Sequence, residues 1–137
     1  MGTNQLNHLI IEFYEKLSSW ESSIVRGNEL TLSQTHVIEV LGHHKALRMK
    51  ELAEKMGVTT GSLTVVVDKL VKKELIRRTP HVSDRRSLIV ELTEKGMACF
   101  VEHDRLHSHL TEEISHHLTE EENRQLEAIL AKINEVI

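Results

Sequence analysis

The stretch MKELAEKMGVTTGSLTVVVDKLVKK, residues 49–73, decides how this chain of 137 residues folds. Met49–Met56 has the length of a short helix, and the next residue, Gly57, readily takes the left-handed conformation that ends a helix. Thr59 or Thr60 can then cap a second helix, whose apolar residues recur at helical spacing. Two helices joined by so short a turn have the proportions of a helix-turn-helix motif, in which the second helix reads DNA.

A β-hairpin is expected directly after this pair of helices. The segments 75–79 and 87–92 have β-like sequences, and the second alternates, with Leu88, Val90 and Leu92 on one face. The polar segment 81–86 between them is interpreted as the hairpin tip, and the arginines placed around it are Arg77, Arg78, Arg85 and Arg86. A helix can read base edges in the major groove while an arginine-tipped ribbon enters the narrow, electronegative minor groove.

Amphipathic helices are expected on both sides of this centre, because apolar residues recur there every three or four positions. One spans Asn4 to Trp20, and another opens at the capping box of Thr31 and Gln34 and ends near Gly42. After the hairpin, Thr93 caps a long helix towards His117, and Thr119 with Glu122 opens the last one. The predicted order is four helices, two strands and two helices.

The charge is distributed unevenly along the chain. The net charge is −4, yet the segment from Lys45 to Arg86 holds eleven basic and only five acidic residues. A basic middle between acidic arms suits a nucleic-acid reader, although clustering by chance would give the same pattern. Aromatic residues are only 3 % of the chain, which disfavours a stacking platform for single strands.

Composition also excludes other classes of protein. The apolar runs are too short to cross a bilayer, and the N-terminal residues lack the features of a signal peptide. A single cysteine, Cys99, fits a reducing cytoplasm. No nucleophile with a base and an orienting group is evident, and no phosphate-cradling glycine loop is present, so an enzyme is not expected.

The chain resembles the MarR family of bacterial winged-helix transcription regulators over essentially its whole length. Four segments carry the resemblance, and they are Leu30-Thr31-x-x-Gln34, Leu52-Ala53-x-x-Met56-Gly57-Val58, Asp84-Arg85-Arg86-Ser87 and Val90-x-Leu92-Thr93-x-x-Gly96. The resemblance implies one domain over residues 1–137, with a winged helix-turn-helix at 31–93 and a helical dimerisation region at 1–30 and 94–137. It also implies a homodimer on a palindromic operator. The DNA-contacting residues that it implies are Ser62, Thr64, Val65, Lys69, Arg85 and Arg86.

Ten histidines call for a separate explanation, because a winged helix needs no excess of them. His103 and His107 lie four residues apart, so both imidazoles project from one face of the predicted helix and could hold one metal ion. A zinc-peptidase motif is disfavoured, because the segment reads His103-Asp104-Arg105-Leu106-His107, with no glutamate after the first histidine. Solvated histidines on a polar helix are the other interpretation.

The histidine pattern is similar to that of the zinc-sensing branch of the family, the repressors of zinc-uptake genes. That resemblance assigns one zinc ion to Glu21, His36, His103 and His107. The branch's second site lacks its counterparts here, because Thr35 replaces an acid and no cysteine follows the first helix. Nickel, cobalt or copper would also bind three imidazoles and a carboxylate. The alternative function is a repressor that responds to a small aromatic or phenolic effector instead of a metal.

Overall fold

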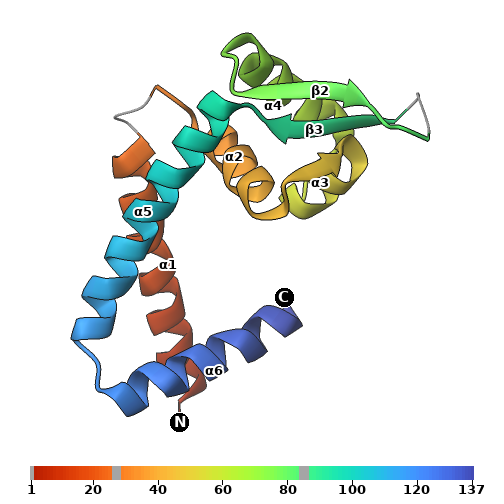
Figure 1. Ribbon diagram of the computed structural model, residues 1–137. Helices are drawn as coiled ribbons and strands as arrows, with labels where there is room; N and C mark the ends of the chain where they lie inside the picture. Colours follow the sequence, from red (N-terminus) through yellow and green to blue (C-terminus); the bar gives the residue numbers. More distant parts are fainter. Residues whose placement is uncertain (1, 26–28, 84–86) are drawn as a thin grey trace. The chain divides into compact units, whose positions relative to one another are not determined.

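The computed structural model describes residues 2–25, 29–83 and 87–137 (Figure 1). The chain forms two compact units, Met1–Phe100 and Val101–Ile137. The mainly helical fold with a small β-wing is confirmed. In chain order, the elements are α1 (Thr3–Val25), α2 (Leu32–His44), β1 (Ala46–Arg48), α3 (Met49–Met56), α4 (Thr60–Lys72), β2 (Ile76–Pro80), β3 (Leu88–Leu92), α5 (Glu94–His116) and α6 (Glu120–Val136).

The junction between α3 and α4 is built as the sequence predicts. Gly57 ends α3 with a φ of 68°, in the left-handed region that a residue with a Cβ rarely adopts. The hydroxyl of Thr59 then accepts a hydrogen bond from the backbone N–H of Ser62 at 3.1 Å, which caps α4. Because both caps sit within three residues of each other, they fix where α4 begins.

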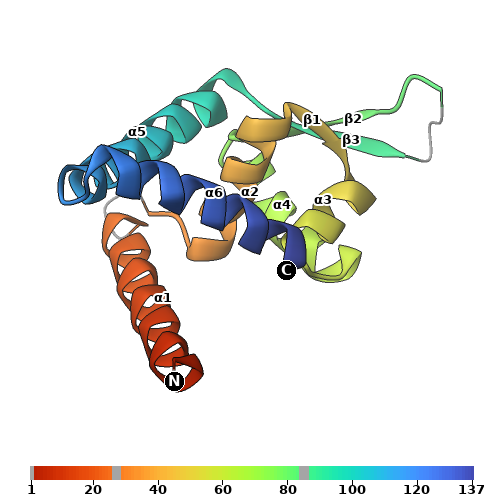
Figure 2. The same cartoon turned by 90° about the horizontal axis from the view of Figure 1, so that it is seen from below.

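The sheet has one more strand than the two that the sequence predicts. Its order is β1-β3-β2, with antiparallel pairs that place Leu47 opposite Val90 and Thr79 opposite Ile89. Figure 2 shows the three labelled strands side by side, with β1 leading into α3. The predicted order of elements is therefore wrong at this point. A strand of three residues is too short to show an alternating pattern, and only its pairing with β3 defines it.

The apolar core of the first unit lies where α2, α3, α4 and the sheet meet. Side chains that are almost completely buried include Leu41, Leu52, Leu63, Leu70 and Val90. Phe100, near the start of α5, packs against this core, and its ring lies so close to Gly42 of α2 that a Cβ there would fall 2.0 Å from the ring. The winged segment thus completes its core within its own unit.

The two terminal helices present apolar side chains that this chain leaves exposed. In α1 only Val25 is buried, while Leu9, Ile10 and Phe13 are about half exposed. In α6 no residue is buried, although a capping box of Thr119 and Glu122 forms its start as predicted. No helix among the described residues combines the length and the apolar character that crossing a membrane requires.

Candidate nucleic-acid interface and metal ligands

The helix α4 presents four of the six residues that the family resemblance assigns to DNA contact. Ser62, Thr64, Val65 and Lys69 are all exposed, while Leu63, Val67 and Leu70 on the opposite face fill the core. The lysine ammonium has no ion-pair partner among the described residues, so its charge is available to a phosphate group. The structure therefore leaves this helix face open, and the roles of its residues stay a prediction.

Two of the four arginines expected around the hairpin tip are bound to carboxylates. Arg77 donates a hydrogen bond to Glu91 at 2.8 Å, and Arg78 donates one to Asp68 of α4 at 2.6 Å. The expectation that both surround the hairpin tip is wrong, because each lies on β2 and is held by a carboxylate of a neighbouring element. The Arg78 pair links the hairpin to α4. Arg85 and Arg86, which the sequence also assigns to DNA contact, lie outside the described residues.

The place of one basic residue beside the hairpin was not predicted from the sequence. Arg48 ends β1, and its guanidinium lies 3.0 Å from Nε2 of His81. The other ring nitrogen of that histidine, Nδ1, accepts a hydrogen bond from the backbone N–H of Ser83 at 3.1 Å. Only the recognition of β1 as a strand could have placed this arginine beside the hairpin.

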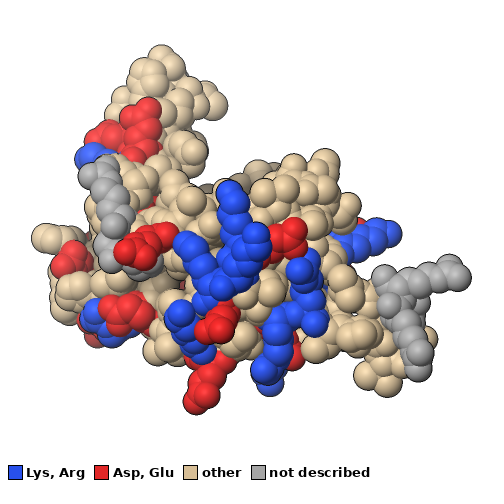
Figure 3. Space-filling model, turned by 90° about the horizontal axis from the view of Figure 1, so that it is seen from above, with Lys and Arg blue, Asp and Glu red and all other residues tan. Residues whose placement is uncertain are grey.

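Basic side chains also gather on one face of the molecule. Figure 3 shows Lys and Arg side chains grouped over one face of the molecule, with several acidic side chains among them. This face of the molecule is therefore basic, and it is not free of carboxylates. Such a surface attracts phosphate groups most strongly at low salt.

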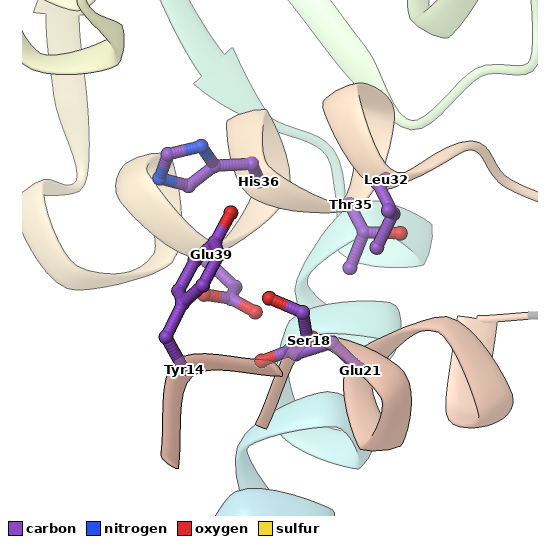
Figure 4. A pocket seen from close by; sticks show the side chains of 7 residues that line it. All are labelled: Tyr14, Ser18, Glu21, Leu32, Thr35, His36 and Glu39. Carbon is purple, nitrogen blue, oxygen red and sulfur yellow. The ribbon is translucent and has the colours of Figure 1, made fainter. Parts of the chain in front are cut away.

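The first unit places two predicted metal ligands in one pocket. Glu21 of α1 and His36 of α2 line a cavity of about 480 Å³, together with Tyr14, Ser18 and Leu32 among others (Figure 4). The carboxylate is half-buried and the imidazole is exposed. Both residues therefore line the same pocket, and their role as metal ligands stays a prediction.

The second unit brings the other two predicted ligands together. Nε2 of His103 and Nε2 of His107 lie 3.0 Å apart, and the ring centroids are 4.7 Å apart. Two nitrogens bound to one tetrahedral zinc ion at its usual bond length of about 2.0–2.1 Å would be about 3.3 Å apart. The pair therefore fits a metal ion, and a hydrogen bond between one protonated and one unprotonated nitrogen fits the same distance.

One candidate ligand in the pocket was not predicted. Glu39 follows His36 by three residues on α2, so it lies on the same side of that helix, and its half-buried side chain lines the same pocket. One carboxylate oxygen of Glu39 and one of Glu21 lie within 4.8 Å of each other. The spacing from His36 was the available signal, but the resemblance drew attention to the histidine alone.

Taken together, the helix-turn-helix, the antiparallel wing and the basic surface define a winged-helix DNA-binding protein. A family model described as "MarR family" matches residues 30–88. The chain is 35 % identical to the HTH-type transcriptional repressor MdtR of Bacillus subtilis over 76 % of its own length and 67 % of that protein. This chain therefore belongs to the MarR family.

Solved structures agree with this assignment. The crystal structure of Streptococcus pneumoniae FabT in complex with DNA superposes with a TM-score of 0.89 at 24 % identity, covering 97 % of this chain and 95 % of that chain. A mutant of Escherichia coli MarR complexed with operator DNA has a TM-score of 0.75 at 28 % identity, covering 94 % of this chain and 93 % of that chain. The likeness confirms the predicted winged-helix fold.

Proposed function

We propose that this chain is a cytoplasmic transcriptional repressor that binds a palindromic operator as a homodimer and responds to zinc. The name of the relative MdtR and the operator DNA bound to Escherichia coli MarR support the repressor and DNA-binding parts. The exposed face of α4 and the basic surface supply the contacts that duplex DNA requires.

The homodimer is supported by the apolar side chains that the terminal helices leave exposed. Leu126, Ile129 and Ile133 of α6 recur at three- and four-residue spacing and are about 37–52 % exposed. A stripe of this kind on a helix with no buried residue is costly in water, and a second copy of the chain would cover it. Two copies related by a two-fold axis would present two α4 helices to the two halves of a palindrome.

The metal response rests on one observation, the convergence of the His103 and His107 nitrogens at 3.0 Å on one face of α5. We assign the remaining ligands to Glu21 and His36, the acid and the imidazole that line the α1–α2 pocket. Three nitrogens and one carboxylate oxygen form a closed shell with no position for a substrate, which suits a sensor.

The ligands indicate how metal and DNA would be coupled. They come from α1, α2 and α5, and the elements β1, α3, α4, β2 and β3 lie in the chain between α2 and α5. Ligands that hold these helices at a fixed separation would favour one spacing of the two α4 helices in the dimer. Such linkage is typically worth about 1–3 kcal/mol, which is roughly a 5- to 150-fold change in DNA affinity. Tighter DNA binding with zinc is the direction that the resemblance to uptake repressors implies.

The pocket itself supports a second candidate function. Its volume of about 480 Å³ lies within the usual range for a small-molecule site, and Tyr14 and Leu32 supply aromatic and apolar lining. A small phenolic effector could bind there in place of a metal. The two candidates differ in whether the histidine pair of α5 takes part.

Metal analysis of the untagged protein separates the candidates. About one tightly held zinc ion per chain is expected, and no zinc even after its addition would favour the phenolic effector. The response is then measured by fluorescence anisotropy with a duplex selected from a random library. His107→Ala should lose zinc affinity and the zinc-dependent gain in DNA affinity.

The matched control for this experiment is His109→Ala. His109 lies two residues further along α5, is exposed and contacts Glu113 at 3.3 Å, so its loss should leave the zinc response unchanged. Full zinc affinity and full zinc response in the His107→Ala variant would mean that the histidine pair is only a solvated face.

A further inference from the structure

We propose that Arg48 and His81 are positioning residues for DNA binding, because their contact holds the β2–β3 hairpin in the orientation in which it meets the duplex. This inference rests on the proposed DNA binding and is independent of the zinc response. Neither residue is among the six that the family resemblance assigns to DNA contact.

The outer part of the hairpin, residues 80–83 and 87–88, has two strands only. The third strand of the sheet, β1, pairs with β3 as far as the pair of Arg48 with Ile89. The hairpin continues past the end of β1 (Figure 2), where the N–H of His81 donates a hydrogen bond to the carbonyl of Ser87 at 2.8 Å. Two strands without a third are only marginally stable in water. A further contact is therefore needed to keep this part of the hairpin in one orientation.

The Arg48 side chain supplies such a contact across the sheet. Because the strand order is β1-β3-β2, the last residue of β1 and the residue that follows β2 lie on opposite sides of β3. Nη2 of Arg48 nevertheless lies 3.0 Å from Nε2 of the half-buried His81, so the arginine side chain spans β3. The contact joins β1 to a part of the hairpin that β1 does not reach by backbone pairing.

The position of the proton on the His81 ring decides whether this contact is a hydrogen bond. Two groups that can only donate face the two ring nitrogens, and they are the Arg48 guanidinium at Nε2 and the backbone N–H of Ser83 at Nδ1. A neutral imidazole has one N–H and one lone pair, so it accepts only one of these two bonds at a time.

The tautomer with the proton on Nδ1 satisfies more of the surrounding groups. In this tautomer Nε2 accepts from Arg48, and the Nδ1–H donates to the hydroxyl oxygen of Ser83, which lies 2.9 Å away. The other tautomer turns an N–H of the ring against an N–H of the guanidinium, and the contact with Arg48 is lost. Since the partner of one ring nitrogen sets which nitrogen carries the proton, the contact predicts an Nδ1–H imidazole.

The place of His81 in the hairpin links this contact to DNA binding. Arg85 and Arg86, which the family resemblance assigns to DNA contact, follow His81 by four and five positions in the sequence. Groups that bind a ligand need supporting residues that hold them in the productive geometry. The guanidinium of Arg48 is directed to His81, so we expect its loss to weaken DNA binding without removing a phosphate contact.

The first experiment measures the affinity of the full-length protein for a duplex selected from a random library, by fluorescence anisotropy at several salt concentrations. Arg48→Met and His81→Phe should each lower the affinity about 2- to 10-fold, the range expected for one net hydrogen bond. The double variant should lose no more than the larger single loss, because both changes remove the same contact. The slope of log affinity against log salt should stay that of the wild type, because no phosphate contact is lost.

Two further variants serve as controls. His81→Gln keeps an oxygen that can accept from Arg48, so it should bind DNA more tightly than His81→Phe. Lys45→Met removes the same charge from an exposed residue just before β1, and it should bind DNA as the wild type does. Circular dichroism of each variant confirms that it is folded.

The second experiment detects the tautomer directly, by ¹⁵N NMR of the histidine rings at about pH 8, where free imidazole is neutral. The spectrum of His81→Gln identifies the signals of His81. The wild-type protein should carry the proton on Nδ1. In Arg48→Met the proton should move to Nε2, because Nδ1 then accepts from the backbone N–H of Ser83. A proton on Nε2 in the wild type would overturn the proposal.

The binding measurements can also overturn it. A slope that falls by about 1 in Arg48→Met, with wild-type binding in His81→Phe, would mean that Arg48 contacts a phosphate group itself. Losses that add in the double variant, or wild-type affinity in both single variants, would show that the contact does not position the hairpin. These results leave the proposed function intact. If the wild-type protein binds no duplex even at low salt, the proposed function fails and this inference fails with it.

Discussion

The winged segment and the terminal helices differ in how much of their apolar surface this chain covers. α4 buries Leu63, Val67 and Leu70 against α2, α3 and the sheet. α6 is longer and has a comparable number of apolar residues, yet it buries none. The comparison indicates that the DNA-reading segment is folded by its own sequence, whereas the terminal helices need a further surface, which we assign to a second copy of the chain.

The two regions also use their charges differently. In the winged segment Arg78 is bound to Asp68 and links the hairpin to α4, so part of the basic charge holds the DNA-reading elements in position. In α5 the contacts of Arg105 with Glu102 and of His109 with Glu113 each lie within the one helix. Pairs within a helix stabilise that helix and add little to tertiary structure.

The largest expected effect comes from a cavity in the core of the winged segment. Leu52 of α3 is fully buried, and Leu52→Ala should lower the free energy of unfolding by about 2–5 kcal/mol. Val82 is 99 % exposed, and the matched change Val82→Ala should alter it by less than about 0.5 kcal/mol. Denaturant titration measures both, and equal losses would mean that the winged segment does not hold the core.

A charge introduced into the apolar stripe of α6 tests whether this helix is covered by a second copy of the chain. Leu126→Asp should weaken dimerisation by about 1–3 kcal/mol, because the carboxylate would lose water in the interface, and Ile133→Asp should do the same. Gln125→Asp puts the same charge beside Leu126 on α6 and should leave the dimer intact. Sedimentation at several protein concentrations measures the shift, and dimers of unchanged affinity in both stripe variants would show that another surface forms the interface.

Most of the fold could be predicted because its signals are local. Gly57, the Thr59 cap and the capping box of Thr31 and Gln34 act through neighbours within four residues, so their sequence shows where helices begin and end. The strand β1 could not be predicted in this way. It exists because Leu47 pairs with Val90, and a contact over so many residues leaves no periodic pattern.

The candidate site was less predictable because its members come from different elements. The spacing of His103 and His107 predicts a shared face, and their nitrogens do converge. The expected position of Arg77 and Arg78 around the hairpin tip is wrong, since the sequence shows a positive charge but not the carboxylate that binds it. Glu39 was overlooked for the same reason, because only the fold brings α1 beside α2 and so places Glu39 near Glu21.

An intermediate effect on DNA affinity is expected for Lys69 of α4, which has no ion-pair partner among the described residues. Arg77 of β2, which is paired with Glu91, is the comparison. Lys69→Gln should lower affinity for duplex DNA, alter sequence preference, and reduce the slope of log affinity against log salt by about 1. Arg77→Gln should change that slope less, because Glu91 already neutralises the arginine. Fluorescence anisotropy between dilute and physiological salt measures both slopes, and wild-type binding that is indifferent to salt would contradict the electrostatic interface.

The smallest expected effect concerns a solvated ion pair on α1. The Lys16 ammonium donates a hydrogen bond to Glu12 at 2.8 Å, and this bond, with the attraction between the charges, lowers the pKa of the Glu12 carboxyl below its ordinary 4.5. A lowered pKa in the folded chain means that the pair adds stability above about pH 4.5, and that this contribution disappears as the pH falls through the pKa of the folded state. Glu12→Gln should therefore be slightly less stable than the wild type at pH 7 and equal to it near pH 3, with the difference at pH 7 reduced by salt. Thermal unfolding at both pH values measures the difference. A large loss of stability at pH 7 that persists near pH 3 would mean that Glu12 packs in an interface. The face of α1 that carries Glu12 would then be buried and not solvated.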